Sequence, residues 1–298
     1  MNGTPDLSVV IAAKNSRTTV VACLRSVFSQ IGPERAEVIV ADGSSDGTAD
    51  IAAEQFPDLS LLRGEADLLV PQLWLMGISA ARGHLVAITI ADCIPNPDWL
   101  VELTTLAREF PGYGGFGGPI DGPENGRGLD WAAYFSRYTA YLDPAELGPA
   151  AEIPGDNAAY PREMLSAWCF PSDGGFWEAL VHARMRKAGI DLLFAPKVRV
   201  QLGRVSGAWQ FAGTRFRHGR HYGSTRPAAS AVIRSARCMA APLLAPFLLL
   251  RIVRRVAARR PDLTPELLRS LPWLSLFLLA WSLGEAAGYL SPGQRAKW

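Results

Sequence analysis

Cysteine and histidine are scarce in this chain of 298 residues, which contains four of each. The cysteines at positions 23, 93, 169 and 238 lie roughly 70 residues apart, without the close pairs that bind zinc or build a small disulfide scaffold. Only His218 and His221 stand near enough in sequence to share a ligand. The sequence therefore predicts reduced thiols and argues against a zinc-finger or disulfide-framework protein.

The first apolar run does not have the pattern of a signal peptide. It covers residues 7–13, lacks a basic lead-in, and is followed by Lys14 and Asn15 rather than by a cleavage site. We therefore expect the N-terminal part of the chain to stay in the cytoplasm.

Acidic residues are absent from a long stretch of the C-terminal half. Residues 199–260 contain thirteen arginines and no aspartate, glutamate or lysine, whereas residues 1–102 contain thirteen acidic and six basic residues. Hydrophobic residues make up 49% of the chain and charged residues 19%, a globular composition, and the length suggests about two domains. The charge asymmetry predicts a metal or polar-ligand site in the acidic part and an anionic partner, phosphate or lipid, for the arginine-rich part.

The first hundred residues alternate between the patterns of strands and helices. Buried strands are expected at 7–13, 37–41, 59–62 and 85–90, and amphipathic helices at 18–31, 48–56 and 70–82. Strands separated by helices pair in parallel, with helices on both faces of the sheet. Ligands of such sheets bind outside the carboxyl ends of the strands, where Asp42 and Asp92 each follow a strand.

The middle of the chain has weaker patterns. The glycine-rich residues 112–123 are expected to form a strand with loops, and residues 129–142 an aromatic-rich helix. Residues 155–157 form a predicted turn, and residues 176–188 a helix that contains Glu178.

The last third of the chain is apolar and rich in arginine. Residues 238–250 are too short to cross a bilayer core of about 30 Å, but residues 271–290 have the length of a spanning helix. Residues 251–260 contain five arginines, which suit a lipid-facing anchor, a cytoplasmic loop or a solvated helix face. We expect a helical, membrane-associated region at 231–298; the alternative is a soluble helical hairpin packed on the main domain.

Five segments, in order, resemble the family 2 glycosyltransferases. They are residues 8–15 (SVVIAAKN), 37–48 (EVIVADGSSDGT), 87–100 (AITIADCIPNPDWL), 155–165 (GDNAAYPREML) and 174–189 (GGFWEALVHARMRKAG). The resemblance covers roughly 220 residues and implies an α/β fold of the GT-A type over residues 1–230, a mostly parallel, Rossmann-like sheet flanked by helices.

This resemblance implies a nucleotide-sugar donor site. The implied donor-binding residues are Ala13, Asn15, Asp42, Ser44, Asp92, Arg217 and Arg220. Family members usually have two aspartates, one residue apart, at the end of the fourth strand, but this chain reads Ile90-Ala91-Asp92. Asp92 is therefore the one implied ligand of a divalent cation, Mg²⁺ or Mn²⁺, whose coordination diphosphate oxygens and water would complete. The alternative is that Asp92 merely caps the loop before Pro95.

A carboxylate is also needed to accept the proton of the acceptor hydroxyl. The resemblance puts Glu178 at the position of the catalytic aspartate, with Asp156 as the second candidate. Glu178 also has a structural explanation, because an acid in the first turn complements the helix dipole. Asp46 is expected to cap the helix that begins at Thr48.

Together these features predict an inverting glycosyltransferase at the cytoplasmic face of a bacterial inner membrane. It would move a sugar from a nucleotide-diphosphate donor to a lipid-linked or polysaccharide acceptor, with anionic membrane lipid as a partner. The alternative is a catalytically degenerate accessory protein of a polysaccharide assembly complex, which the missing first aspartate favours. We expect no nucleic-acid partner, because the arginine run lacks interleaved aromatic residues.

Overall fold

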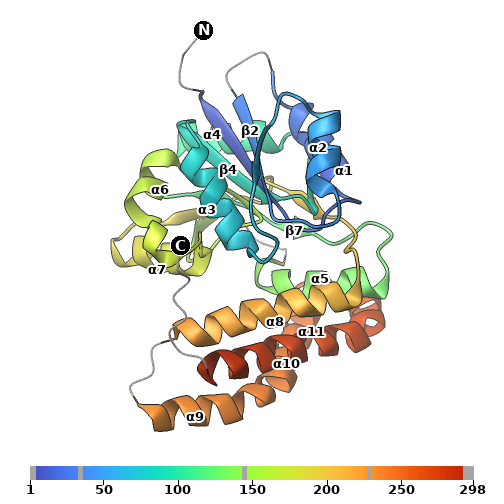
Figure 1. Ribbon diagram of the computed structural model, residues 1–298. Coiled ribbons are helices and arrows are strands. Elements are labelled where there is room, and N and C mark those ends of the chain that lie inside the picture. The colour runs from blue at the N-terminus through green and yellow to red at the C-terminus, as the bar shows by residue number, and fades with distance from the viewer. Residues whose placement is uncertain (1–4, 33–35, 143–145, 227–229, 291–298) are drawn as a thin grey trace. The chain divides into compact units, whose positions relative to one another are not determined.

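A computed structural model describes residues 5–32, 36–142, 146–226 and 230–290 (Figure 1). The chain forms two compact units. Unit 1 comprises Met1–Glu124 and Asp143–Arg204, and unit 2 comprises Asn125–Leu142 and Val205–Trp298. The last eight residues of the region expected at 231–298 lie outside the described residues.

Unit 1 is built around an eight-stranded sheet. Its strands follow the order β3-β2-β1-β4-β9-β6-β10-β8. Four parallel strands come first: β1 (Leu7–Ala13), β2 (Ala36–Asp42), β3 (Ser60–Arg63) and β4 (Leu85–Ile90). β9 (Asn157–Pro161) then runs antiparallel to its neighbours β4 and β6. The remaining strands are short: β6 (Phe116–Gly117), β8 (Gly148–Ala150) and β10 (Leu192–Phe194). Every residue of β1 and β4 is buried, as expected of central strands covered on both faces.

Three helices connect the four parallel strands of unit 1: α1 (Val20–Phe28), α2 (Thr48–Gln55) and α3 (Val70–Ala80). The helices α4 (Trp99–Glu109), α6 (Arg162–Trp168) and α7 (Glu178–Lys187) follow β4 in the chain. α3 packs on β1 and β2. Gly77 allows this close approach, because a Cβ there would lie 2.3 Å from Cγ1 of Val10 in β1. The predicted α/β architecture is confirmed.

A second, three-stranded sheet continues from the end of β4. It has the order β5-β11-β7, formed by Cys93–Pro95, Val200–Leu202 and Ile120–Asp121. β5 begins immediately after Asp92, so this small sheet holds the chain on the C-terminal side of that residue.

Unit 2 is helical throughout the part that the structure describes. Its helices are α5 (Gly128–Tyr138), α8 (Ala208–Thr225), α9 (Ala231–Ala240), α10 (Leu244–Arg259) and α11 (Thr264–Leu290). α11 is the central helix, with contacts to α5, α8, α9 and α10. Two segments, Ala231–Arg259 and Pro261–Leu290, are long and apolar enough to cross a membrane; 11% and 39% of their apolar windows are buried.

α8 and α11 cross at unusually short range. A Cβ on Gly219 or Gly223 of α8 would lie 2.2–2.3 Å from backbone carbonyl oxygens of α11. A Cβ on Gly284 or Gly288 of α11 would lie equally close to carbonyl oxygens of α8. Each helix thus presents two glycines four residues apart, the spacing that lets two helix backbones touch.

The bounds of these units differ from the expected division at residue 230. α5 and α8 belong with the C-terminal helices, because both pack on α11. Gly128, at the start of α5, lies so near α11 that a Cβ would meet the carbonyl oxygen of Arg269 at 2.6 Å. The hydrophobic pattern of α5 predicted a helix but not the partner that its apolar face covers.

Candidate active site

The strand ends of unit 1 bring the nominated acids to one edge of the sheet. In the strand register, Ala13 at the end of β1 pairs with Asp42 at the end of β2, and Ala12 pairs with Ile90 of β4. On the other side of β4, Thr89 pairs with Asn157, the first residue of β9. Asp42, the last residue of β2, therefore stands at the same edge as Asp92, which follows β4, and Asp156, which precedes β9. For Asp42 and Asp92 the sequence predicted this position.

Asp42 is buried and held by the turn that follows it. Its carboxylate accepts hydrogen bonds from the backbone N–H of Ser44 (2.9 Å) and from the Ser44 hydroxyl (2.8 Å). Asn15 lies across from this turn, with a left-handed φ of 55°. Its backbone N–H donates to Oγ of Ser44 (2.7 Å), and its side-chain oxygen accepts from the backbone N–H of Ser45 (2.9 Å). The loops after β1 and β2 thus form one hydrogen-bonded cradle that contains Asn15, Asp42 and Ser44.

Asp46 has a structural role in the next turn. One carboxylate oxygen accepts the backbone N–H of Thr48 (3.1 Å), at the first residue of α2, and the other accepts the N–H of Arg17 (3.3 Å). Asp46 therefore holds the first residue of α2, as a structural role predicts, although the N-cap residue itself is Gly47.

Asp92 is half-buried at the end of β4. Its Oδ1 accepts a hydrogen bond from the Thr19 hydroxyl (2.7 Å), just before α1, and its backbone carbonyl accepts the N–H of Gly203 (2.7 Å). Among the described residues, no three His, Cys, Asp or Glu side chains come together as a metal cluster. A cation here would take one carboxylate from Asp92 and its other ligands from bound diphosphate and water.

Glu178 and the Asp156 loop lie close together. Gly155 separates Trp74 from Glu178: a Cβ on this glycine would lie 3.0 Å from the Trp74 ring and 3.4 Å from the carboxyl carbon of Glu178. Glu178 is the first residue of α7 and is only half-buried, whereas Asp156 is buried. The two candidate bases therefore occupy one neighbourhood, and the glycine leaves room for the glutamate.

The loop that carries Asp156 is fixed from both sides. The Thr89 hydroxyl donates to the backbone carbonyl of Asp156 (2.8 Å). The next residue, Asn157, accepts from the Trp99 indole N–H (2.7 Å) and donates its amide to two carbonyls of neighbouring loops. The Trp74 indole N–H also donates to Thr89, at its backbone carbonyl (2.8 Å). β4 thus positions both Asp92 and the candidate base region.

Sequence reasoning missed Thr19, Trp74 and Thr89. Thr19 is 73 residues from Asp92 and Thr89 is 67 from Asp156, so no local spacing connects either pair. A threonine within the otherwise apolar run 85–90 was the one available signal, because a buried hydroxyl needs a partner.

Arg217 and Arg220, the other nominated donor contacts, lie on α8 in unit 2. Their role at the donor stays a prediction. The neighbouring Arg215 stacks over the Trp281 ring, with its guanidinium carbon 4.4 Å from the ring centroid.

A mostly parallel sheet with a polar cradle and acids at its strand ends, followed by a short antiparallel strand, defines the GT-A class of α/β proteins. Residues 8–168 match the model of glycosyl transferase family 2, so the chain belongs to this family. This confirms the family that the five sequence segments indicated.

Relatives share the N-terminal part of the chain. Uncharacterized glycosyltransferase YibD of Escherichia coli is 33% identical over 112 residues, 37% of this chain and 32% of the relative. The succinoglycan biosynthesis protein ExoO of Rhizobium meliloti is 35% identical over 104 residues, 35% and 30% of the two chains. The matched part of the chain spans about a third of the length of these relatives.

Solved structures share the fold. The mannosyltransferase PcManGT from Pyrobaculum calidifontis, in complex with GDP-Man and Mn²⁺, has a TM-score of 0.52 and 20% identity, over 97% of this chain and 75% of that one. TarS of S. aureus, residues 1–349 in complex with UDP, has a TM-score of 0.50 and 15% identity, over 92% and 90% of the two chains.

Proposed function

We propose that this protein is an inverting glycosyltransferase that moves a sugar from a nucleotide-diphosphate donor to a lipid-linked or polysaccharide acceptor. The observation that carries the proposal is the meeting of three elements at one sheet edge. These are the Asn15, Asp42 and Ser44 cradle, Asp92 at the end of β4, and the Asp156 loop with Glu178 beside it.

Each element has a task in the transfer. The cradle would hold the base or ribose of the nucleotide through Asp42, with Ala13 and Asn15 lining the end of β1. The acceptor hydroxyl would attack the anomeric carbon while the Glu178 carboxylate takes its proton, and the bond from that carbon to the diphosphate breaks. A single displacement of this kind inverts the anomeric centre. Asp156 is the reserve candidate for the base.

A divalent cation fits the residues at the end of β4. Asp92 offers a half-exposed carboxylate whose orientation is fixed by the Thr19 hydroxyl, and hard oxygen ligands of this kind suit Mg²⁺ or Mn²⁺. When bound, such a cation supplies charge neutralisation for the leaving diphosphate. The complexes of PcManGT and GalNAc-T7 with Mn²⁺ support a metal in this fold.

The acceptor and the location follow from the relatives and from unit 2. Succinoglycan biosynthesis protein ExoO and a poly-beta-1,6-N-acetyl-D-glucosamine synthase of Staphylococcus epidermidis are named for polysaccharides, which supports a growing glycan or a lipid-linked glycan as acceptor. The two apolar segments of unit 2 support association with a membrane. We propose the cytoplasmic face of a bacterial inner membrane, where nucleotide sugars are made.

Calorimetric titration with UDP and GDP, with and without Mn²⁺, tests the donor site. We expect one nucleotide to bind, and Mn²⁺ to strengthen its binding at least tenfold, because Asp92 would hold the cation and the cation would neutralise the charge of the diphosphate. Asp92→Asn should remove the enhancement by Mn²⁺, whereas Asp98→Asn, at an exposed position before α4, should keep it. Equal affinity with and without the cation would contradict the proposed metal site.

The single aspartate at the end of β4 also favours a second function, that of an accessory subunit without turnover. Mass spectrometry of reactions with a panel of nucleotide sugars and membrane extract separates the two. Transfer to a membrane glycolipid supports the enzyme. Tight nucleotide binding without any transfer or donor hydrolysis supports the accessory protein.

A further inference from the structure

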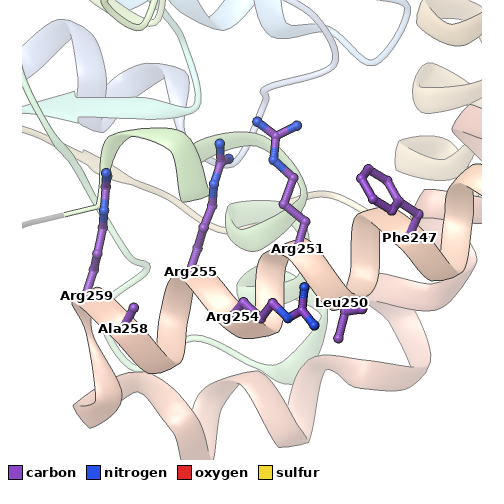
Figure 2. A pocket seen from close by; sticks show the side chains of 7 residues that line it. All are labelled: Phe247, Leu250, Arg251, Arg254, Arg255, Ala258 and Arg259. Carbon is purple, nitrogen blue, oxygen red and sulfur yellow. The ribbon is translucent and has the colours of Figure 1, made fainter.

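One face of α10 combines apolar and arginine side chains around a groove. The groove has a volume of about 280 Å³ and is lined by Phe247, Leu250, Arg251, Arg254, Arg255, Ala258 and Arg259. These positions are three or four residues apart and therefore share one side of the helix. Phe247 and Leu250 occupy its N-terminal end, and four arginines with Ala258 line the rest, as Figure 2 shows.

The arginines of this groove repel one another. The side chains of Arg251, Arg255 and Arg259, one helical turn apart, rise from the same side of α10, and Arg254 lies along the helix toward Leu250 (Figure 2). Like charges four residues apart destabilise a helix. Among the described residues, no carboxylate lies within ion-pair distance of these four arginines; the ion pair of this stretch joins Arg260 to Asp262. Negative charge from outside the protein would relieve the repulsion.

Exposed apolar side chains continue from the groove along α9 and the start of α10. The exposed fractions of Met239, Leu243 and Phe247 are 80%, 72% and 61%, and no residue of α9 is buried. An exposed apolar strip of this length marks an interaction surface. Arginines accompany this apolar strip, and residues 199–260 contain no acidic residue. This pattern is typical of a helix that lies in a membrane interface.

We infer that α9 and α10 lie along a membrane surface and that the α10 groove binds the phosphate headgroups of anionic lipids. The planar guanidinium groups would hold phosphate oxygens in bidentate pairs, and Phe247 and Leu250 would contact the adjoining hydrocarbon. A soluble phosphate would leave the apolar strip exposed, which favours a lipid. Ala231–Arg259 has the length of a spanning segment, but its uncharged part, residues 238–250, is shorter than a bilayer core of about 30 Å and is bounded by Arg237 and Arg251. This favours a position along the surface over spanning.

This inference rests on the membrane association proposed above, but not on the transfer chemistry. Its test is co-sedimentation of the full chain with vesicles of phosphatidylcholine alone or with phosphatidylglycerol added. We expect strong binding to the phosphatidylglycerol vesicles alone. The triple variant Arg251→Gln, Arg255→Gln and Arg259→Gln should bind them roughly 100-fold more weakly, since each arginine near an anionic surface strengthens binding about fivefold.

A matched triple variant controls for net charge. Arg25→Gln, Arg108→Gln and Arg162→Gln removes three exposed arginines from unit 1 and should bind vesicles within about twofold of the wild type. Phe247→Ser should weaken vesicle binding while leaving circular dichroism and the melting temperature unchanged, which separates lost contact from lost folding.

Three results would overturn the inference. They are equal loss of binding in both triple variants, equal binding of the wild type to both kinds of vesicle, and stronger retention on a DNA duplex than on phosphatidylglycerol. Nucleotide titration of the same preparations keeps the two proposals apart: a protein that binds nucleotide but not vesicles refutes the lipid site alone.

Discussion

Glu178 is the residue on which the proposed chemistry depends most. Glu178→Gln keeps the size of the side chain but cannot accept a proton, so we expect the rate of sugar transfer to fall at least 100-fold. The dissociation constant of the nucleotide should stay within about twofold, because the donor cradle is formed by other residues. Transfer assays and calorimetry on the same protein measure both.

A structural glutamate provides the control for this variant. Glu163 lies exposed in the first turn of α6, and Glu178 likewise belongs to the first turn of α7, so Glu163→Gln removes the same kind of helix-dipole interaction. It should leave transfer unchanged. If Glu178→Gln also retains wild-type turnover, Glu178 is not the base, and Asp156 becomes the candidate to test.

His182, one turn after Glu178 in α7, predicts a pH dependence of stability. Its Nε2 lies 2.8 Å from the Tyr160 hydroxyl, and burial, together with the charge of Arg186, lowers its pKa from 6.5 to about 4. The unfolded chain therefore binds a proton between pH 6.5 and 4 that the folded chain does not. Stability linked to His182 is complete above pH 6.5 and is lost as the pH falls toward 4.

Urea unfolding at pH 7, 5.5 and 4 measures this dependence. Between pH 7 and pH 4 the wild type should lose up to about 3 kcal/mol more unfolding free energy than His182→Gln. His84→Gln, at an exposed position, should follow the wild-type profile. Parallel profiles for the wild type and His182→Gln would show that the buried imidazole does not set the acid limit.

The sequence was enough to identify the acidic residues of the candidate site, but not the residues that form hydrogen bonds around them. Asp42 and Asp92 stand out because each follows an apolar strand, and the end of a strand is visible in one chain. Thr19 and Trp74 fix this region through contacts with residues distant in sequence, Asp92 and Thr89, that no spacing rule anticipates. The roles of Glu178 and Asp156 rest on family resemblance and on their meeting at Gly155.

At the scale of elements, long buried strands were predictable and short paired ones were not. β1 and β4 have the bounds that their hydrophobic runs predicted, 7–13 and 85–90. The three strands of the second sheet have two or three residues each, too few to show a period of two. Their pairing depends on the chain returning from residue 200 to residue 93, which is tertiary information.

The crossing of α8 and α11 makes a prediction about glycine. A Cβ on Gly284 would lie 2.1 Å from the backbone carbonyl oxygen of Phe216, and that oxygen cannot move away unless the helices separate. Gly284→Ala should therefore lower the unfolding free energy of unit 2 by about 1–3 kcal/mol, despite the higher helix propensity of alanine. Chemical denaturation followed by circular dichroism measures the change.

Gly213→Ala is the matched control on α8. A Cβ on Gly213 would have no atom within 4 Å beyond its own helix, so helix propensity acts there without a clash. This variant should be neutral or up to about 1 kcal/mol more stable. A loss of stability at Gly213 equal to that at Gly284 would mean that the close crossing is not the cause.

At the scale of the whole molecule, the excess of arginine in the C-terminal part of the chain predicts which washes release the protein from a membrane. A protein held at the surface by arginines and a shallow apolar strip should sediment with membranes at low salt and be released by about 1 M NaCl, which screens charge beyond roughly 3 Å. Alkaline carbonate should release it as well. Retention in the pellet after both washes would instead indicate a spanning segment.

The order of the units along the chain limits where this protein can be truncated or joined to a homologue. Residues 125–142 belong to unit 2, yet they are inserted within the sequence of unit 1. A protein truncated after residue 204 would keep α5, whose buried residues include Phe135, but would lose α11, the helix on which α5 packs. Such a fragment would expose aromatic surface and aggregate. Exchanging unit 1 between homologous chains while keeping unit 2 therefore requires three junctions, one on each side of residues 125–142 and one after residue 204, rather than a single C-terminal splice.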